Sequence, residues 1–327
     1  MFNNLHMKCI APLTKYIVTA LLTMCVSAAH AQTDLDGIMM NKQQFCTGLI
    51  YGSGKWDKYW EGTFFRENLN LGTVSSNSVM LMGNYGVKDN LNILFGLPYI
   101  SNKASLGVSN GASGIQDLSA WVKWMPIEKD IRNSTISLYL LAGASTPLTD
   151  YIVDFLPLSI GLKSSTLSGR IMVDYQIGNF FATASETYTI RGNSRLERNS
   201  YFTTQLYLTD QVAMPDVNMV NIRAGYRSSK LIAEAIFSNT TTLGGFDISK
   251  NNMPFPSNRM NSNSVGVNIK YEINKVPGLS LVGGGSQVLN GRNVGKSTGV
   301  YGGVFYILNF SRKKKKETST SSTQKSN

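Results

Sequence analysis

The sequence predicts an all-β protein: a transmembrane antiparallel β-barrel of the outer-membrane type with about twelve strands, in a range of about ten to fourteen. Two observations predict this fold. After residue 31 the chain never has eighteen consecutive apolar residues, which a membrane-spanning helix would need. It has instead segments of about ten residues in which apolar and polar side chains alternate. The clearest are residues 91–100, 135–145, 264–273 and 299–310.

The first 31 residues have the features of a secretory signal peptide. Lys8 and Lys15 form a positive region, residues 16–29 are an apolar stretch too short to span a bilayer, and Ala29-His30-Ala31 is a small-x-small cleavage site. We therefore expect export and a mature chain that begins at Gln32. A lipoprotein acylated on Cys25 is the alternative, but Thr23-Met24 fits poorly the small residues expected before such a cysteine.

Polar breaks divide the rest of the chain into strands. Short turns alternate with longer connections, as in bacterial barrels with short periplasmic turns and long outer loops. Both chain ends would then be periplasmic. Two more runs, 45–51 and 201–208, also alternate, so the barrel could have thirteen or fourteen strands. The twelve expected strands lie near residues 57–68, 75–87, 91–101, 115–126, 135–145, 167–177, 180–190, 218–228, 231–239, 264–273, 279–289 and 298–310.

The last strand resembles the terminal signal that the outer-membrane assembly machinery reads. Its side chains Val304, Tyr306, Leu308 and Phe310 share one face and would meet lipid. Tyrosine and tryptophan near the ends of other strands suit the interfacial girdles of a barrel, with a soluble β-sandwich as the alternative.

We expect the barrel to occupy residues 32–310. Residues 311–327 are basic and rich in Ser and Thr, which predicts a disordered periplasmic tail or a tether to an anionic envelope polymer.

The residues that would remain after cleavage exclude the commonest catalytic chemistry. Both histidines, His6 and His30, lie in the signal, and Cys46 is the one cysteine outside it. Histidine-dependent triads and His/Cys zinc sites therefore cannot form, no internal disulfide is possible, and Cys46 is expected to be an inert thiol. No local Asp/Glu pair indicates glycosidase chemistry. We expect no enzyme, no metal and no cofactor.

The positive charge lies mainly at the two ends of the chain. Of the formal charge of +11, the signal carries +2 and residues 311–327 carry +5, which leaves +4 for residues 32–310. A basic stripe through the folded part, which nucleic-acid binding would require, is not indicated. The partners expected are membrane lipid, the assembly machinery and a small-molecule solute. Nothing in the sequence fixes the oligomeric state.

Strand parity predicts which side chains line the lumen. Asp117 and Lys123 share a face opposite Leu118 and Trp124, and a charge on the lipid side would cost about 2–4 kcal/mol at the midplane. The mixed signs also allow a structural network of ion pairs that fills the lumen. Phe246 and Phe255 are loop candidates for capturing a solute. The lumen candidates are Asp117, Ser119, Trp121, Lys123, Asp174, Arg223, Glu234, Lys270 and Glu272.

Several motifs resemble a known barrel family, the putative meta-pathway of phenol degradation proteins. The hairpin Tyr85 to Ile100, YGVKDNLNILFGLPYI, resembles that family's Tyr-Gly, polar turn and strand ending in Pro-Tyr. In the same order follow Gly114-x-x-Asp117-Leu118-Ser119 with Lys123, then Gly143-x-x-Thr146-Pro147 and Gly291-Arg292-Asn293. Gln116 stands where the family usually has Gly, which puts a tight bend there in question.

The resemblance implies an outer-membrane channel or transporter for passive uptake or efflux of small, apolar or aromatic molecules. Its motifs specify architecture rather than chemistry, so the transported molecule stays open. The alternative is a non-conducting structural or surface-binding barrel whose outer loops contact a partner. Whether the lumen is open would discriminate the two.

Overall fold

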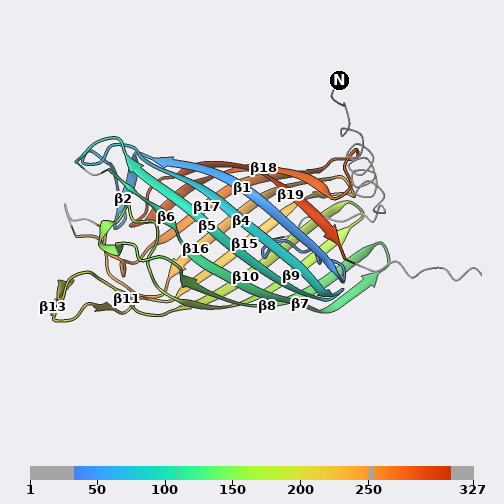
Figure 1. Ribbon diagram of the computed structural model, residues 1–327, viewed down its shortest axis with the longest axis horizontal. Helices are drawn as coiled ribbons and strands as arrows, with labels where there is room; N and C mark the ends of the chain where they lie inside the picture. The colour runs from blue at the N-terminus through green and yellow to red at the C-terminus, as the bar shows by residue number, and fades with distance from the viewer. Residues whose placement is uncertain (1–32, 109, 250–253, 311–327) are drawn as a thin grey trace, which may run out of the picture.

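The structure, a computed structural model, describes residues 33–108, 110–249 and 254–310. The predicted signal peptide (1–31) and basic tail (311–327) lie outside the described residues. Within them the chain forms one closed antiparallel barrel with twelve wall strands (Figure 1). Closure comes from β1, which pairs with β19 on one side and with β4 on the other. No helix of the described residues is long and apolar enough to cross a membrane.

The wall strands follow one another around the barrel in chain order, joined as neighbouring hairpins. Their bounds are β1 Gln44–Trp56, β4 Val74–Lys88, β5 Leu91–Ala104, β7 Asp117–Ile131, β8 Ser134–Pro147, β9 Thr166–Ile177, β10 Phe180–Arg191, β15 Val217–Arg227, β16 Leu231–Thr242, β17 Asn261–Glu272, β18 Leu279–Arg292 and β19 Thr298–Asn309. The short strand β6, Ala112–Ile115, continues β7 across a break.

The break between β6 and β7 falls at Gln116, the position where the family pattern expects glycine. Tyr99 pairs with Ile115 and Gly96 with Ser119, so one extra residue stands on the β6–β7 side. This is a β-bulge, and it bends the strand without a glycine. The backbone N–H of Gln116 still donates to the carbonyl of Pro98, 2.9 Å away.

Short turns gather at one end of the barrel and long loops at the other. The short turns are residues 89–90, 132–133, 178–179, 228–230 and 273–278, at the end where β1 begins and β19 finishes. The opposite, outer end carries the 3-10 helix η1 and three small hairpins. Their bounds are η1 Val153–Phe155, β2 Lys58–Glu61 with β3 Phe64–Glu67, β11 Ser194–Arg195 with β14 Gln211–Val212, and β12 Tyr201–Phe202 with β13 Leu206–Tyr207.

The prediction that the first wall strand lies near residues 57–68 is wrong. The wall strand is β1, which contains the alternating run 45–51 that the sequence left as an extra candidate. Residues 58–67 instead form the β2–β3 hairpin in the first outer loop. The aromatic side chains of 57–68 gave it the stronger strand pattern, whereas β1 is rich in Gly and Ser because its inner face lines the lumen. Residues 201–208 form the β12–β13 hairpin and are not part of the wall.

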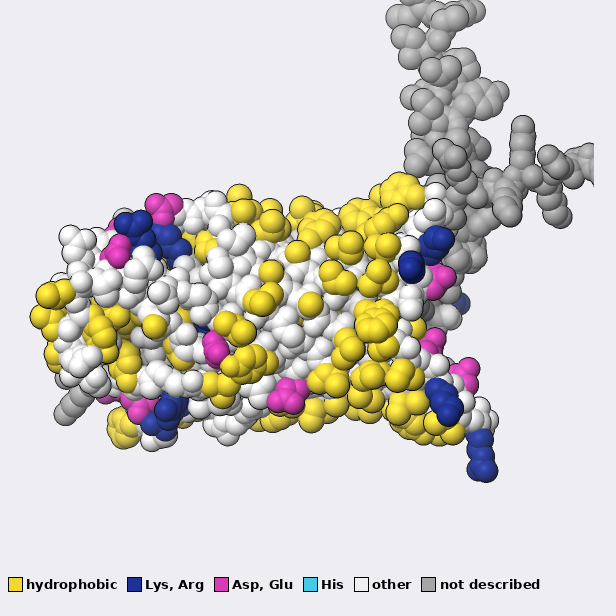
Figure 2. Space-filling view, turned by 90° about the horizontal axis from the view of Figure 1, so that it is seen from below, with side chains coloured by type: hydrophobic (Ala, Val, Ile, Leu, Met, Phe, Trp, Pro, Cys, Tyr) yellow, Lys and Arg dark blue, Asp and Glu magenta, His cyan; other side chains and the backbone are white. Residues whose placement is uncertain are grey.

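The outer surface of the wall is apolar and the inner surface is polar. In β9 and β10 exposed and buried residues alternate along the whole strand, with Leu167, Ile171 and Val173 outside and Arg170 and Asp174 inside. Figure 2 shows hydrophobic side chains spread over the strands, while most charged side chains lie toward the two ends. A barrel with this apolar belt leaves no free sheet edge in lipid, so the fold is that of a transmembrane barrel.

Candidate functional site

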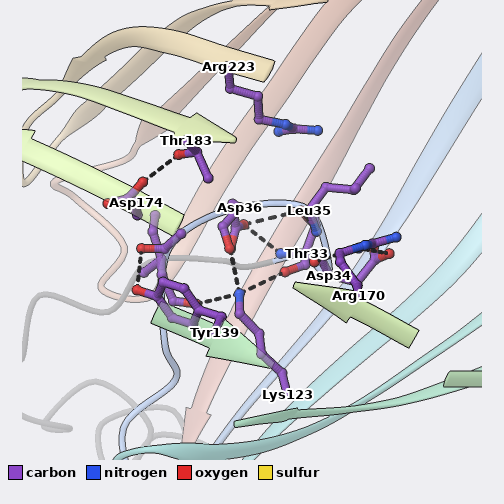
Figure 3. A network of polar contacts seen from close by, with 12 residues as sticks. Thr33, Asp34, Leu35, Asp36, Lys123, Tyr139, Arg170, Asp174, Thr183 and Arg223 are labelled. Atoms are coloured by element: carbon purple, nitrogen blue, oxygen red, sulfur yellow. Dashed lines mark hydrogen bonds and ion pairs between the residues drawn. The ribbon is translucent and has the colours of Figure 1, made fainter. Parts of the chain in front are cut away.

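The inner half of the lumen holds a piece of the chain's own N-terminal region. This segment, Thr33–Gln43, precedes β1 and lies against inward side chains of β7, β8 and β9 (Figure 3). Its far end is tied to the β4–β5 turn, since Gln43 N donates to the carbonyl of Gly86 at 2.8 Å and Lys42 N to Asp89 Oδ1 at 2.9 Å. The lumen is therefore partly filled from the end where the short turns lie.

Lys123 is the main contact that holds the segment. Its side chain is 0% exposed, and Nζ donates to the carbonyls of Thr33, Asp36 and Ile38 at 3.3, 2.5 and 2.8 Å. It also pairs with Asp36 Oδ1 at 3.2 Å. A buried ammonium needs this many acceptors, because burying an unpaired charge is very costly.

Two further inward side chains, Arg170 and Tyr139, hold the same segment. Arg170 pairs with Asp34 Oδ2 at 3.0 Å and also donates to the carbonyl of Asp34, while Tyr139 Oη donates to the carbonyl of Gly37 at 2.8 Å. A Cβ added at Gly37 would collide with the carboxylate of Asp174. Glycine at this position lets the segment pass close to the wall.

Two further ion pairs lie in the lumen, one between the neighbouring strands β15 and β16 and one between β15 and β9, which are separated by β10. Arg227 donates to Asp174 Oδ2 at 3.0 Å, and Arg223 Nη1 to Glu234 Oε1 at 2.8 Å. Glu234 also accepts from Asn268, which accepts from Tyr301 Oη at 2.8 Å. The resulting hydrogen-bonded row, Tyr301–Asn268–Glu234–Arg223, crosses β19, β17, β16 and β15.

Two cavities lie in the lumen. The inner cavity, about 300 Å³, lies between the N-terminal segment and the wall formed by β15–β19, β1 and β4. The outer vestibule, about 570 Å³, is lined mainly by Gly and Ser of β1, β4, β17, β18 and β19. Tyr301 lines both cavities.

The outer mouth carries a cluster of aromatic side chains from two loops. Tyr201 stacks on Tyr207 with ring centroids 5.0 Å apart, Phe255 lies 5.3 Å from Tyr201, and Phe246 lies 6.0 Å from Phe255. Arg198 covers Phe255 at 5.8 Å and pairs with Asp154 of a third loop at 2.9 Å. We call Tyr201, Tyr207, Phe246 and Phe255 the outer aromatic cluster. Cavities of about 460 and 310 Å³ flank it.

The structure brings some of the sequence candidates together and leaves others apart. Asp117 lies at the outer end of β7, where it accepts from Tyr151 of a loop at 2.8 Å, and Ser119 donates to the carbonyl of Gly96 at 3.3 Å. Trp121 packs under Arg170, 4.6 Å from the ring centroid. Lys270 lines the inner cavity, and Glu272 ends β17 at the short-turn end of the barrel.

Strand parity places Arg170 on the lumen face, but sequence reasoning missed the N-terminal segment and its contacts with Arg170 and Tyr139. One signal was available: the segment holds Asp34 and Asp36 just before the first strand, whereas the inward positions of the wall strands hold several basic residues. Tyr301 was not among the predicted lumen residues. Its position between two cavities depends on the barrel's closure.

The closed wall, its apolar belt and its polar lumen define the class of this molecule: it is an outer-membrane β-barrel. The family model described as "Putative MetA-pathway of phenol degradation" matches residues 65–301, so the chain belongs to that family. The predicted fold class, family and outer-membrane location are confirmed.

A solved outer-membrane structure shows the same fold. An outer membrane channel from Pseudomonas putida F1 superposes with a TM-score of 0.68 at 12% identity, over 85% of this chain and 100% of that one. The translocator domain of the autotransporter NalP from Neisseria meningitidis has a TM-score of 0.42 at 11% identity, over 92% of this chain and 95% of that one. No curated protein matches the chain significantly.

Proposed function

We propose that the protein is an outer-membrane channel for passive uptake or efflux of small, apolar or aromatic molecules, and that it carries out no catalysis. The proposal rests on one observation: the wall of the barrel is complete by itself, and the N-terminal segment fills only part of the lumen inside it. The twelve strands close without the N-terminal segment, while the vestibule and inner cavity leave space beside it. Removing or shifting the segment would therefore widen the path without opening the wall.

The outer aromatic cluster supports an apolar or aromatic solute. Phe246 lines both mouth cavities and Phe255 lines the larger one, and aromatic side chains attract apolar and aromatic molecules by burial and stacking. A solute captured there would pass the Ser- and Gly-lined vestibule and then the inner cavity. The family's description, which refers to phenol degradation, and the channel among the solved structures both agree with this proposal.

Liposome swelling tests the channel. We expect the parent protein to admit small uncharged solutes slowly, and a variant with residues 33–39 replaced by Gly and Ser to admit them several times faster. The control replaces the exposed residues Lys129 and Asp130 by Ser, which leaves the N-terminal segment untouched. If neither the parent protein nor the segment variant admits solute, the channel proposal is rejected.

That negative result would favour the alternative, a non-conducting barrel whose outer loops contact a partner. One observation suits it: the tip of the β12–β13 hairpin exposes Phe202, Leu206 and Leu208, at 69, 62 and 83%. Exposed apolar groups that lie together are typical of contact surfaces. Replacing Leu206 and Leu208, which do not line the mouth cavities, by Ser should leave swelling unchanged if the channel proposal is right.

A further inference from the structure

We propose that the inner cavity is a binding site for a small uncharged molecule with an apolar body and one hydrogen-bonding group, and that Tyr301 separates this site from the vestibule. The route by which the molecule arrives rests on the proposed channel function. The binding site itself rests on the shape, lining and charge of the cavity.

One side of the cavity is apolar. Ile50, Met82, Val282 and Phe305 come from β1, β4, β18 and β19, which are neighbours across the closure of the barrel. Phe305 is only 4% exposed and lies over Gly48, where a Cβ would collide with its ring. Leu35 and Ile38 of the N-terminal segment complete this surface. At about 300 Å³ the cavity is at the small end of ligand sites, which suits a single ring or a chain of similar size.

The opposite side of the cavity is polar but balanced in charge. Three basic and three acidic side chains line it, so no excess of one sign attracts an ion. The Arg223–Glu234 pair is satisfied within the wall at 2.8 Å. A charged ligand would have to lose its hydration without gaining an unbalanced partner, and that is unfavourable. The six side chains are Asp34, Asp36, Arg223, Arg227, Glu234 and Lys270.

Hydrogen-bonding capacity remains on that side for an uncharged group. Asn268 and Tyr301 line the cavity and carry donor and acceptor atoms of the row that ends at Arg223. A hydroxyl or carbonyl group of the ligand can add one hydrogen bond to this row. An ionised group of the ligand would instead disturb the Arg223–Glu234 ion pair. A few placed polar groups within an apolar site are the usual source of orientation and specificity.

Tyr301 is held between the two cavities. Its hydroxyl is fixed by Asn268 at 2.8 Å, and its ring lies against Gly284, where an added Cβ would come within 2.7 Å of Cζ. The vestibule above is lined by small residues such as Gly52, Ser78 and Ser286, so it is wider than the inner cavity. Tyr301 is therefore a specificity-determining residue that limits the size of what enters.

Ligand titration of the purified protein in detergent, followed by NMR saturation transfer, tests the site. The probes are benzyl alcohol and its charged relatives benzoate and benzylammonium. We expect saturable binding of benzyl alcohol and at least tenfold weaker binding of both ions. Val282→Trp should fill the cavity and weaken benzyl alcohol binding at least tenfold. Leu281→Trp is the matched control, because the neighbouring side chain is 44% exposed and faces lipid.

Equal binding of the three probes, or unchanged binding by Val282→Trp, would overturn the proposal. If Val282→Trp does not fold, Ile50→Phe fills the same cavity from β1 and must give the same loss. Liposome swelling with Tyr301→Ala then tests whether Tyr301 limits the size of the solutes that enter. We expect solutes larger than benzyl alcohol to enter at least threefold faster, and an unchanged size limit would reject the role of Tyr301. A protein that binds benzyl alcohol but never admits solute would reject the channel and leave the site in place.

Discussion

At the scale of single residues, buried charges in the lumen are explained by their partners. Lys123 is fully buried yet has four acceptor contacts, three of them carbonyls of the N-terminal segment. Strand parity places Lys123 on the lumen face and leaves open whether it lines a path or joins a network of ion pairs. Its contacts show instead that it binds the chain's own segment, so its mutation should first affect that segment.

Lys123→Met should release the N-terminal segment while the wall stays paired. Removing one partner of a buried ion pair costs about 3–5 kcal/mol, and this loss acts on the segment, which wall pairing does not need. We expect larger single-channel conductance and a thermal midpoint close to that of the parent. Lys129→Met, an exposed position on the same strand, is the control. Unchanged conductance together with a large drop in melting temperature would mean that Lys123 supports the wall instead.

At the scale of elements, strand pattern predicts the wall well where one face meets lipid. β9 alternates along its length and β17 alternates from Val265 onward, and their expected and observed bounds agree within a few residues. Only residues 45–51 of β1 were considered, as an additional candidate strand, because Gly and Ser interrupt the alternation after them, while the aromatic β2–β3 hairpin gave the stronger signal. A short outer hairpin that packs its aromatic side chains looks like a wall strand when only its sequence is read.

The outward side chains of β19 should be required for membrane assembly. Tyr306 is 38% exposed and Phe310, just after β19, is 58% exposed. Replacing both with Lys should block insertion, because a lysine on the lipid face costs about 2–4 kcal/mol near the midplane and less toward the interface. Thr298→Lys at the outer end of the same strand is the control. Cell fractionation with a heat-modifiability gel measures the outcome, and normal insertion of the double variant would contradict this orientation.

An outer-loop contact should loosen in acid. Arg292 Nε donates to Asp247 at 2.7 Å and Asn293 Nδ2 donates at 2.8 Å, and the hydrogen bond from Arg292 lowers the pKa of Asp247 below its ordinary 3.8. Since this pKa is lower in the folded state, the contact contributes fully above pH 3.8, declines below that pH and is lost as the pH falls through the lower pKa of the folded state.

Limited proteolysis between pH 3 and 5 measures this change in the loop 243–260. Cleavage by pepsin, compared at equal enzyme activity, should rise at the acidic end, and Asp247→Asn should show the higher cleavage already at pH 5. A loop whose cleavage does not change with pH in either protein would show that the Asp247–Arg292 contact does not hold it.

At the scale of the whole molecule, closure of the wall determines stability. Every wall strand has a hydrogen-bonded neighbour on both sides, since β4–β5 and β1–β19 complete the ring. In lipid each unpaired backbone group would cost several kcal/mol, so partial opening of the ring is disfavoured and the barrel should unfold as one unit.

The purified protein should therefore migrate differently on a gel before and after boiling. The unheated sample should keep its compact barrel in dodecyl sulfate and run faster than the heated one, and circular dichroism in detergent should show a spectrum dominated by β-structure. The Gly/Ser replacement of residues 33–39 should keep both properties. A helical spectrum, or identical mobility with and without heating, would be incompatible with the closed wall.

The sequence alone determined the class of fold, the hairpin order and the inward or outward face of most strands. These are local properties, because the period-2 pattern of a strand reports directly which side meets lipid. It could not determine the partners of Lys123, the two cavities on either side of Tyr301 or the meeting of Phe246 with Phe255. Those depend on which strands become neighbours at closure and on a segment with no regular pattern that folds into the lumen. Only the tertiary structure brings residues 33–43 and 123 together, since 80 or more positions separate them in the chain.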